Sequence, residues 1–386
     1  MRRILYISGT RADYGPARHV LQTIQKEADF ELGILVTGMH LDSAHGETWR
    51  EIAADGFTIT EKVYGRVIGD TVEAMAASVG LFLYGMSQAM ARYKPDVVLI
   101  LGDRGEALAG AMAAAFQNIV VVHLCGGTLS GSIDDSIRHA ITKFAHYHLT
   151  PFEDSARRII QMGEDPSTVQ VVGLPGGDIR PDVTFTREQI CAEYNLPANQ
   201  PYLLVIQHSV THSQAEAGKQ ITETLEALAA SGYPTLLANP NDDAGGRLIL
   251  AEMRKYAERH PSLRLLPPPG SREKFASIMA HAGALVGNSS SALVEAMSVG
   301  LPVVNIGDRQ RGREPFSCWL NVDYNRDKIR QALDTAFNDE AYRRKLADFT
   351  KLLTALDTST LTANCLRTLD LNKGRSPKSF HDLKPQ

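Results

Sequence analysis

Short apolar runs alternate with helical stretches along most of the chain. The runs are rich in β-branched residues and, over the first half of the sequence, occupy positions 2–8, 30–38, 96–103, 119–124 and 168–173. Stretches such as 106–118 and 134–146 lie between them and have the composition of helices. The runs do not alternate polar and apolar residues, which is typical of strands that are buried on both faces. The pattern therefore predicts an α/β protein with a parallel sheet and helices on both of its faces.

A second series of the same kind follows a break at residues 172–186. This segment, VGLPGGDIRPDVTFT, is rich in Gly, Pro and Asp, and we interpret it as a linker between domains. We therefore predict an N-terminal domain at 1–175, a C-terminal domain at 186–355, and a C-terminal helix and tail at 356–386. The end of this tail, RSPKSFHDLKPQ, is expected to be poorly ordered.

Length and composition agree with two ordinary α/β domains. The 386 residues exceed one typical core, and 44% are hydrophobic and 22% charged. A net charge of −4 gives no reason to expect nucleic acid or an anionic membrane as partner. No apolar run approaches the roughly 20 residues that span a bilayer. The N-terminal MRRILYISGT is interpreted as a first strand rather than a signal peptide, because its apolar run breaks at Gly9.

The four cysteines lie far apart and lack the spacing of a zinc site. Neither a disulfide framework nor a metal centre is therefore expected, and a reducing cytoplasmic location fits this usage. Motifs of several enzyme classes are also missing from the sequence. The chain contains no GxxxxGK[ST], no GxGxxG after the first strand, no HExxH and no GxSxG. P-loop ATP hydrolysis, ordinary NAD binding and serine-hydrolase chemistry are accordingly disfavoured.

Polar residues follow the predicted strands in both domains. Ligands of open parallel sheets bind beyond the carboxyl ends of the strands, so these residues are candidates for a functional site. In the first domain they are Arg11, Asp13, His40, Asp103, Arg104 and the stretch HLCGGTLSGSIDDSIRH at 123–139. In the second domain they are His208, Asn241, Asp242, Ser289, Ser290 and Arg309. Two such sets facing each other would make one shared site in a cleft between the domains.

Several of these residues also have a purely structural explanation. The segment GNSS places hydroxyls and free N–H groups before a helix that contains Glu295, which suits a phosphate or diphosphate and a ribose. The same serines could simply cap that helix. Asp134 is likewise a candidate N-cap, and Cys125 is a candidate inert buried thiol. His208 could be an ordinary histidine at a strand end.

Eight motifs occur in a fixed order along the chain. They are GTRADYG, TGMHLD, GDRGEALAGA, GGTLSGSIDDSIRHAITKFAHYHL, QHSVT, PNDDAG, GNSSSALVEA and GDRQRGRE. Together they resemble the hydrolysing UDP-N-acetylglucosamine 2-epimerases of sialic and legionaminic acid biosynthesis, from about residue 3 to about residue 315. The resemblance implies a GT-B fold, in which two Rossmann-like domains with parallel sheets enclose an inter-domain cleft.

The resemblance also implies roles for individual residues. Asp103, Asp134, His208 and Cys125 match catalytic positions, and Asp13, His40 and Arg138 would lie towards the sugar or the cleft. The UDP-binding positions are Arg11, Arg104, Asn241, Ser289, Ser290, Glu295 and Arg309. A UDP-sugar is the implied partner, and no cofactor or metal is implied. The family further implies a homodimer.

The family's reaction begins with anti elimination of UDP across C1 and C2 of the sugar. Water then adds to the resulting glycal and releases the free 2-epimer, of the ManNAc type. Removing the C2 proton requires a positioned base, and protonating the glycal from the opposite face requires an acid. Cationic side chains around the diphosphate would stabilise the departing UDP.

At one motif the chain departs from its relatives. It reads HLCGGT where they mostly read HIEGGE, so Cys125 and Thr128 replace two glutamates. A thiol with an ordinary pKa near ~8.5 is mostly neutral at pH 7. Cys125 could therefore donate a proton, but it would be a poor base. Either Asp103 and Asp134 carry the proton transfers alone, or the sugar differs, or the protein is weakly active.

We therefore predict a hydrolysing UDP-HexNAc 2-epimerase. Its substrate would be UDP-GlcNAc or a UDP-2,4-diacetamido-2,4,6-trideoxyhexose of the legionaminic type. The alternatives are a non-hydrolysing UDP-GlcNAc 2-epimerase, a GT-B glycosyltransferase, and a non-catalytic UDP-sugar sensor. Only the loss of both glutamates favours the sensor.

Overall fold

The computed structural model describes residues 1–69, 71–130, 133–177, 179–210, 215–240, 245–289, 295–310 and 318–382. The chain divides into two compact units. Unit 1 comprises Met1–Leu129, Ile133–Gly176 and a C-terminal segment that starts at Leu356, and unit 2 comprises Gly177–Ala355 together with the short segment Ser130–Ser132. The segment interpreted as a linker thus lies mostly within unit 2, where Ile179 N–H donates to Ser298 Oγ (3.3 Å).

Unit 1 is built on a parallel sheet with the strand order β3-β2-β1-β4-β5-β6-β7. Its strands are β1 (Arg2–Ser8), β2 (Phe30–Thr37), β3 (Ile59–Val63), β4 (Val97–Leu101), β5 (Val120–Leu124), β6 (Tyr147–Thr150) and β7 (Val169–Val171). Successive residues of β1 point to opposite faces, and both faces are covered. Ile4 and Tyr6 enter one buried cluster and Leu5 and Ile7 the other, which explains why the run in the sequence does not alternate.

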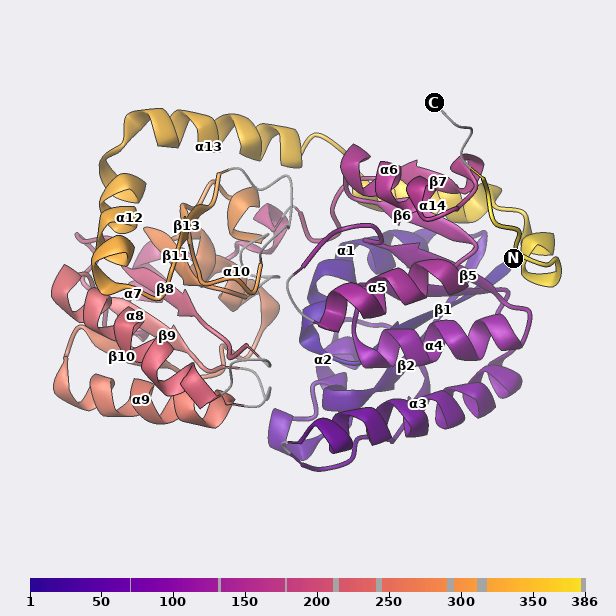
Figure 1. The fold of residues 1–386 in the computed structure, drawn as a ribbon, viewed down its shortest axis with the longest axis horizontal. Helices are drawn as coiled ribbons and strands as arrows, with labels where there is room; N and C mark the ends of the chain where they lie inside the picture. The colour runs from indigo at the N-terminus through magenta and orange to yellow at the C-terminus, as the bar shows by residue number, and fades with distance from the viewer. Residues whose placement is uncertain are drawn as a thin grey trace. The chain divides into compact units, whose positions relative to one another are not determined.

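Helices cover both faces of this sheet (Figure 1). They are α1 (Arg11–Lys26), α2 (Trp49–Ala54), α3 (Val72–Tyr93), α4 (Gly105–Phe116), α5 (Ile133–Phe144), α6 (Glu153–Gln161) and α14 (Thr358–Thr368), with short 3₁₀ turns at Gly38–Leu41, Ser43–His45, Pro166–Thr168 and Leu371–Arg375. Side chains of α1, α2 and α14 join one buried cluster, and side chains of α3, α4 and α5 join the other. The sheet with its two layers of helices is therefore the predicted α/β arrangement.

The helix α3 is an exception to the expectation that no segment is long and apolar enough to span a membrane. Among the described residues it is the one helix that is long and apolar enough to cross a membrane by length and composition. Its alanines and glycines raise the mean hydropathy without forming one unbroken apolar run, so the sequence pattern did not indicate it. Phe82, Met86 and Met90 of α3 are buried in the core of unit 1. Part of its apolar character is therefore explained by packing in the core.

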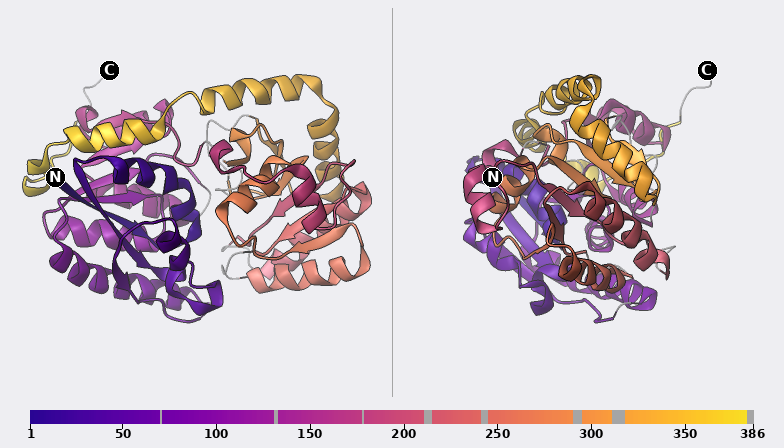
Figure 2. Two further views of the ribbon diagram at one scale, coloured as in Figure 1. Left: turned by 180° about the vertical axis from the view of Figure 1, so that it is seen from behind. Right: turned by 90° about the vertical axis from the view of Figure 1, so that its left-hand side faces the viewer.

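The C-terminal segment belongs to unit 1, where α14 contacts α1 (Figures 1 and 2). Leu366 and Leu369 are buried in the same cluster as the residues of α1. Arg2 of β1 donates from Nη1 to the backbone carbonyls of Leu366 (2.9 Å) and Leu369 (2.8 Å). These contacts join the two ends of the sequence.

The expectation of a poorly ordered tail is wrong for the residues around Lys378. Its Nζ lies 2.5 Å from Glu164 Oε2 and donates to the carbonyls of Thr142 and Lys143, each at 3.0 Å. Glu164 also accepts from Lys143 Nζ (2.6 Å) and lies 3.1 Å from His148 Nε2. The tail thus holds the C-terminal end of α5, because a buried carboxylate attracts its lysine and the last helical carbonyls need donors.

Unit 2 repeats the architecture with the strand order β10-β9-β8-β11-β12-β13, again all parallel. Its strands are β8 (Leu203–Ile206), β9 (Thr235–Ala238), β10 (Leu263–Leu266), β11 (Ala284–Gly287), β12 (Val303–Ile306) and β13 (Leu320–Val322). Its helices include α7 (Arg187–Glu193), α8 (Ala217–Ser231), α9 (Gly246–Arg259), α10 (Arg272–Ala280), α12 (Arg326–Asn338) and α13 (Glu340–Leu353), and a 3₁₀ turn at Arg180–Asp182 precedes them. In both units the strand numbering jumps beside the first strand, β1 to β4 and β8 to β11. This is the switch point beside which ligands of doubly wound sheets bind.

Candidate active site

In unit 1, Arg138 lies buried beside Asp103, one of the predicted catalytic residues. It extends from α5 and is 1% exposed, and its guanidinium pairs with Asp103, which follows β4. Its Nη1 also donates to Asp135 Oδ1 (3.1 Å) and to the carbonyl of Thr128 (2.8 Å). The Asp103 side chain keeps 23% of its surface exposed. Arg138 is therefore placed to orient Asp103, rather than to lie open to a ligand.

Cys125 follows β5 in a strained conformation. Its φ is +64°, a left-handed value that side-chain-bearing residues rarely adopt, and its N–H donates to the carbonyl of Leu149 (3.0 Å). Gly127, two residues later, also has a positive φ, and a Cβ there would lie 2.3 Å from the carbonyl oxygen of Ser155. Such strain is typical of functional turns, because the surrounding structure must enforce it.

Asp134 lies in the first turn of α5 together with Asp135, since the helix begins at Ile133. It is thus inside the helix and not at the N-cap, where the sequence placed it as one possibility. Arg104 precedes α4, and its side chain is 41% exposed with Nε 3.5 Å from Glu106 Oε2. Asp103, Arg104 and Cys125 all follow neighbouring parallel strands, so they share one edge of the sheet.

Asp13 and His40 are buried in a hydrogen-bond network at the ends of β1 and β2. Asp13 completes a capping box of α1, because its Oδ2 accepts from the backbone N–H groups of Thr10 (2.8 Å) and Gly9 (3.1 Å). Ser8 Oγ donates to Asp13 and lies 2.9 Å from His40 Nε2. Burial raises the pKa of Asp13 to about 6, although these hydrogen bonds oppose the rise.

Burial lowers the pKa of His40 to about 4, so the ring is neutral at pH 7. Its Nδ1 lies 2.6 Å from Thr48 Oγ1, so both ring nitrogens have hydroxyl partners. Arg11, at the start of α1, instead extends outward to Glu51, with Nε donating to Oε2 at 3.0 Å. The structure thus gives Asp13 and His40 structural partners and leaves Arg11 half exposed.

In unit 2, Asn288 organises the residues that follow β8, β11 and β12. Its side chain accepts from the His208 N–H (2.7 Å) and donates to the His208 carbonyl (2.9 Å), which fixes that segment. Its own carbonyl accepts from Arg309 Nη1 (3.1 Å) and Gln310 Nε2 (2.9 Å). His208, Ser289 and Arg309 are thereby brought to one edge of the sheet.

Sequence reasoning missed Asn288 and Gly287, although both belong to the quoted GNSS motif. Gly287 has φ +142°, and a Cβ there would lie 2.1 Å from the carbonyl oxygen of Ile206, so only glycine fits. A Gly-Asn pair directly after a buried strand was the available signal. Asn241 and Ser290, predicted to bind UDP, lie outside the described residues, as does Asp242.

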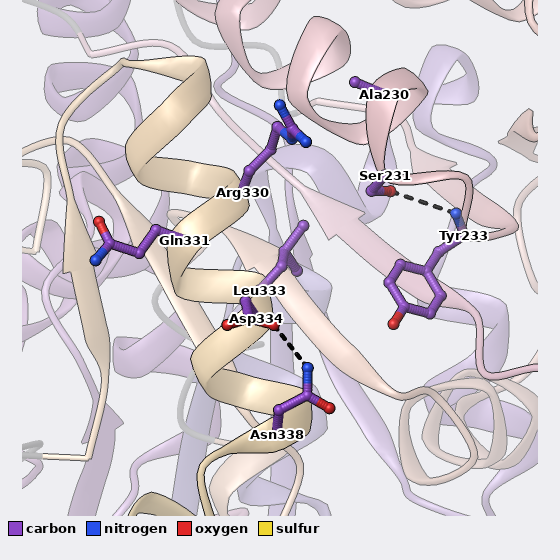
Figure 3. Close-up of a pocket in the computed structure, with 8 residues that line it drawn as sticks. All are labelled: Ala230, Ser231, Tyr233, Arg330, Gln331, Leu333, Asp334 and Asn338. Carbon is purple, nitrogen blue, oxygen red and sulfur yellow. Dashed lines mark hydrogen bonds between the residues drawn. The ribbon is translucent and has the colours of Figure 1, made fainter.

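Glu295 is 3% exposed and helical, and Arg272 Nη1 donates to its Oε2 at 2.9 Å. A cavity of about 400 Å³ in unit 2 lies elsewhere, between α8 and α12 (Figure 3). Its lining includes Tyr233 and Arg330 and none of the predicted site residues. The cavity adjoins the C-terminal end of α8 and the start of β9, the edge of the sheet opposite to the strand carboxyl ends.

Residues 22–365 match the protein family described as UDP-N-acetylglucosamine 2-epimerase. The chain belongs to this family. A Legionella pneumophila protein named UDP-N,N'-diacetylbacillosamine 2-epimerase (hydrolyzing) is 40% identical over 88% of this chain and 89% of its own. A Neisseria meningitidis UDP-N-acetylglucosamine 2-epimerase is 34% identical over 96% of this chain and 100% of its own.

The fold of this family member is also found among solved structures. A crystal structure of UDP-GlcNAc 2-epimerase from Neisseria meningitidis bound to UDP-GlcNAc has a TM-score of 0.80, at 17% identity over 95% of this chain and 100% of that one. At this identity the likeness concerns the fold alone. It confirms the predicted α/β class with two parallel-sheet Rossmann-like domains of the GT-B kind. The protein is therefore an enzyme of the UDP-N-acetylglucosamine 2-epimerase family.

Proposed function

We propose that the protein is a hydrolysing 2-epimerase of UDP-activated N-acetylhexosamines. The observation that carries this proposal is the 40% identity to the Legionella protein, whose name states the hydrolysing activity. A Campylobacter jejuni protein that is 33% identical over 81% of this chain is named GDP/UDP-N,N'-diacetylbacillosamine 2-epimerase (hydrolyzing). Both names favour a 2,4-diacetamido-trideoxyhexose as the sugar, whereas the Neisseria relative favours GlcNAc.

Asp103 and Asp134 are the carboxylates to which we assign the proton transfers. One takes the C2 proton while the bond from C1 to the diphosphate oxygen breaks and UDP leaves with the electron pair. Water then adds its oxygen to C1 of the glycal, and C2 receives a proton on the opposite face. The buried guanidinium of Arg138 pairs with Asp103 and holds this carboxylate in one orientation, which suits a base.

Arg309, His208 and Ser289 support binding of UDP by unit 2. A guanidinium and a hydroxyl at the carboxyl edge of a parallel sheet suit a diphosphate. Cys125, in the position of a family glutamate, would act as a proton donor or not at all, because an ordinary thiol is protonated at pH 7. A cytoplasmic location and a homodimer remain predictions, and light scattering of the purified protein would measure the latter.

The test is a proton and phosphorus NMR time course in D₂O. Parallel tubes hold the protein with UDP-GlcNAc or with the UDP-2,4-diacetamido-trideoxy sugar. We expect free UDP together with a free 2-epimer that carries deuterium at C2. A nucleotide-linked epimer without free UDP would instead indicate the non-hydrolysing reaction. Turnover only on addition of an acceptor would indicate a transferase, and UDP binding without turnover in either tube would indicate a sensor.

Asp103→Asn tests the assigned base. Since general base catalysis contributes about 10²- to 10⁴-fold, kcat should fall by that factor. The Kd for UDP should stay within about threefold, because the assigned UDP-binding residues of unit 2 are unchanged. Asp348→Asn is the control, since that carboxylate lies exposed on α13 and pairs only with Lys351 at 3.4 Å among the described residues. An Asp103→Asn variant with normal turnover would refute the assignment.

A further inference from the structure

Arg272 joins two buried carboxylates in unit 2. It is the first residue of α10, and its side chain is 16% exposed. Its Nε donates to Asp182 Oδ2 (3.2 Å) and its Nη1 to Glu295 Oε2 (2.9 Å). The Asp182 and Glu295 side chains are only 3% and 4% exposed. Three segments that are distant in the sequence thus meet at one guanidinium.

This arrangement fixes the position of Glu295. The planar guanidinium is attached at two points through different nitrogens, so it cannot rotate without breaking one of the bonds. Asp182 is itself held by the backbone of the Arg180–Asp182 turn, which packs against α10. A buried ion pair adds little net stability compared with apolar side chains of similar volume, so we assign this one a role in orienting Glu295.

The second carboxylate oxygen of Glu295 is available for a ligand. Within the part of the chain that the structure describes, Oε2 accepts the bond from Arg272 and Oε1 has no donor. Burial raises the pKa of Glu295, and the guanidinium of Arg272 opposes this rise and favours the ionised acceptor. Because Oε1 has no donor among these residues, a hydroxyl of a bound molecule can donate a hydrogen bond to it.

We propose that Arg272, anchored by Asp182, is a positioning residue that directs Oε1 of Glu295 towards the ribose hydroxyls of a uridine nucleotide. The proposal rests on the proposed function, in which Glu295 belongs to the UDP-binding set. It adds two residues, Asp182 and Arg272, to which the sequence motifs assign no role.

The test compares the binding of UDP and 2′,3′-dideoxy-UDP to the full-length protein by calorimetry. A hydrogen bond to a charged group should make the wild type bind UDP about 10- to 100-fold more tightly than the dideoxy analogue. Arg272→Gln should reduce this ratio to about threefold or less, because Glu295 loses its orienting bond. Arg272→Lys should restore part of the ratio. Asp182→Asn keeps the side-chain volume and removes the charge that anchors Arg272, so it should reduce the ratio by an intermediate factor.

Lys274→Gln is the matched control on the same helix. Lys274 pairs with Glu193 at 2.9 Å, and both side chains are partly exposed, so the ratio should not change. A general loss of folding would weaken both ligands equally and leave the ratio intact. If the wild-type ratio lies in the expected range and persists in both Arg272→Gln and Asp182→Asn, the positioning role is refuted but the UDP site is not. A wild type that does not bind UDP, or does not distinguish the two ligands, would overturn the UDP site as well.

Discussion

Removing the ammonium group of Lys378 should destabilise unit 1. In Lys378→Met, Glu164 loses a partner at 2.5 Å, and the carbonyls at the end of α5 lose a donor. The Glu164 side chain is 1% exposed, so its charge remains buried, but Lys143 still lies 2.6 Å away. Depriving a buried charge of its partner costs about 3–5 kcal/mol, and the remaining lysine should roughly halve this. A cation at a helix C-terminus adds about 0.3–1 kcal/mol.

The sum is a loss of about 2–3.5 kcal/mol in the free energy of unfolding. For a unit of this size, each kcal/mol lowers Tm by roughly 2–4 °C, so we expect a decrease of about 4–14 °C. Circular dichroism during heating at pH 7 measures it. Lys373→Met is the control, because Lys373 lies 3.7 Å from Asp165 and both are exposed. Such a surface pair is worth only about 0–1 kcal/mol.

The loss of stability caused by Lys378→Met should become smaller as the pH falls. Hydrogen bonds from His148, Lys143 and Lys378 outweigh the effect of burial and lower the pKa of Glu164 from its usual 4.5 to about 2. A carboxyl group with a lowered folded pKa stabilises the protein above pH 4.5, and this contribution is lost as the pH falls from 4.5 towards 2. The difference between wild type and Lys378→Met should therefore shrink in that window. Equal Tm values at pH 7, or a difference that is the same at pH 7 and pH 3, would refute the reasoning.

Three further predictions follow from the buried residues of unit 1. Arg138→Met should lower the free energy of unfolding by about 1–3 kcal/mol, because two partly exposed carboxylates lose their shared cation and the Thr128 carbonyl loses its donor. An unchanged urea midpoint would contradict this. Gly127→Ala should lower the free energy of unfolding by about 2–4 kcal/mol, because its Cβ would clash with the Ser155 carbonyl. Gly46 also has a positive φ but open space around it, so Gly46→Ala should cost only about 1 kcal/mol. Equal urea midpoints for the two variants would exclude the clash. The pKa of His40 is lowered from 6.5 to about 4. The stability that its neutral, buried ring gives the folded protein is therefore complete above pH 6.5 and is lost as the pH falls towards 4. An NMR titration of the His40 ring with a midpoint above 6 would contradict its burial.

The sequence predicted those parts of the fold that depend on local pattern. The apolar runs at β1, β2, β4 and β5 are found as strands, because strands covered on both faces are apolar throughout. The short edge strands β3 (Ile59–Val63) and β13 (Leu320–Val322) were missed, since their burial is partial and their composition mixed. The order of the strands in each sheet was not predicted either, because no local sequence pattern contains it.

The candidate site was predictable only as a set of strand ends. Residues directly after strands, such as Asp103 and Arg309, could be named because topology alone brings them to one edge of a sheet. The partners that decide their chemistry could not, since these come from distant positions. Arg272 lies 90 residues after Asp182 and 23 before Glu295, and nothing in the local sequence of α10 indicates that they meet.

The return of α14 to unit 1 has a consequence for synthesis of the protein. The strands β1–β7 leave the ribosome first, yet the apolar surface that receives Leu366 and Leu369 stays uncovered until the chain has passed all of unit 2. At about 5–20 residues per second, this interval lasts roughly 10–40 s. The buried core of unit 2 comes entirely from the continuous stretch Gly177–Ala355 and can therefore be completed earlier. Unit 1, whose first strand is synthesised before any of the strands of unit 2, is thus the last of the two units to complete its core.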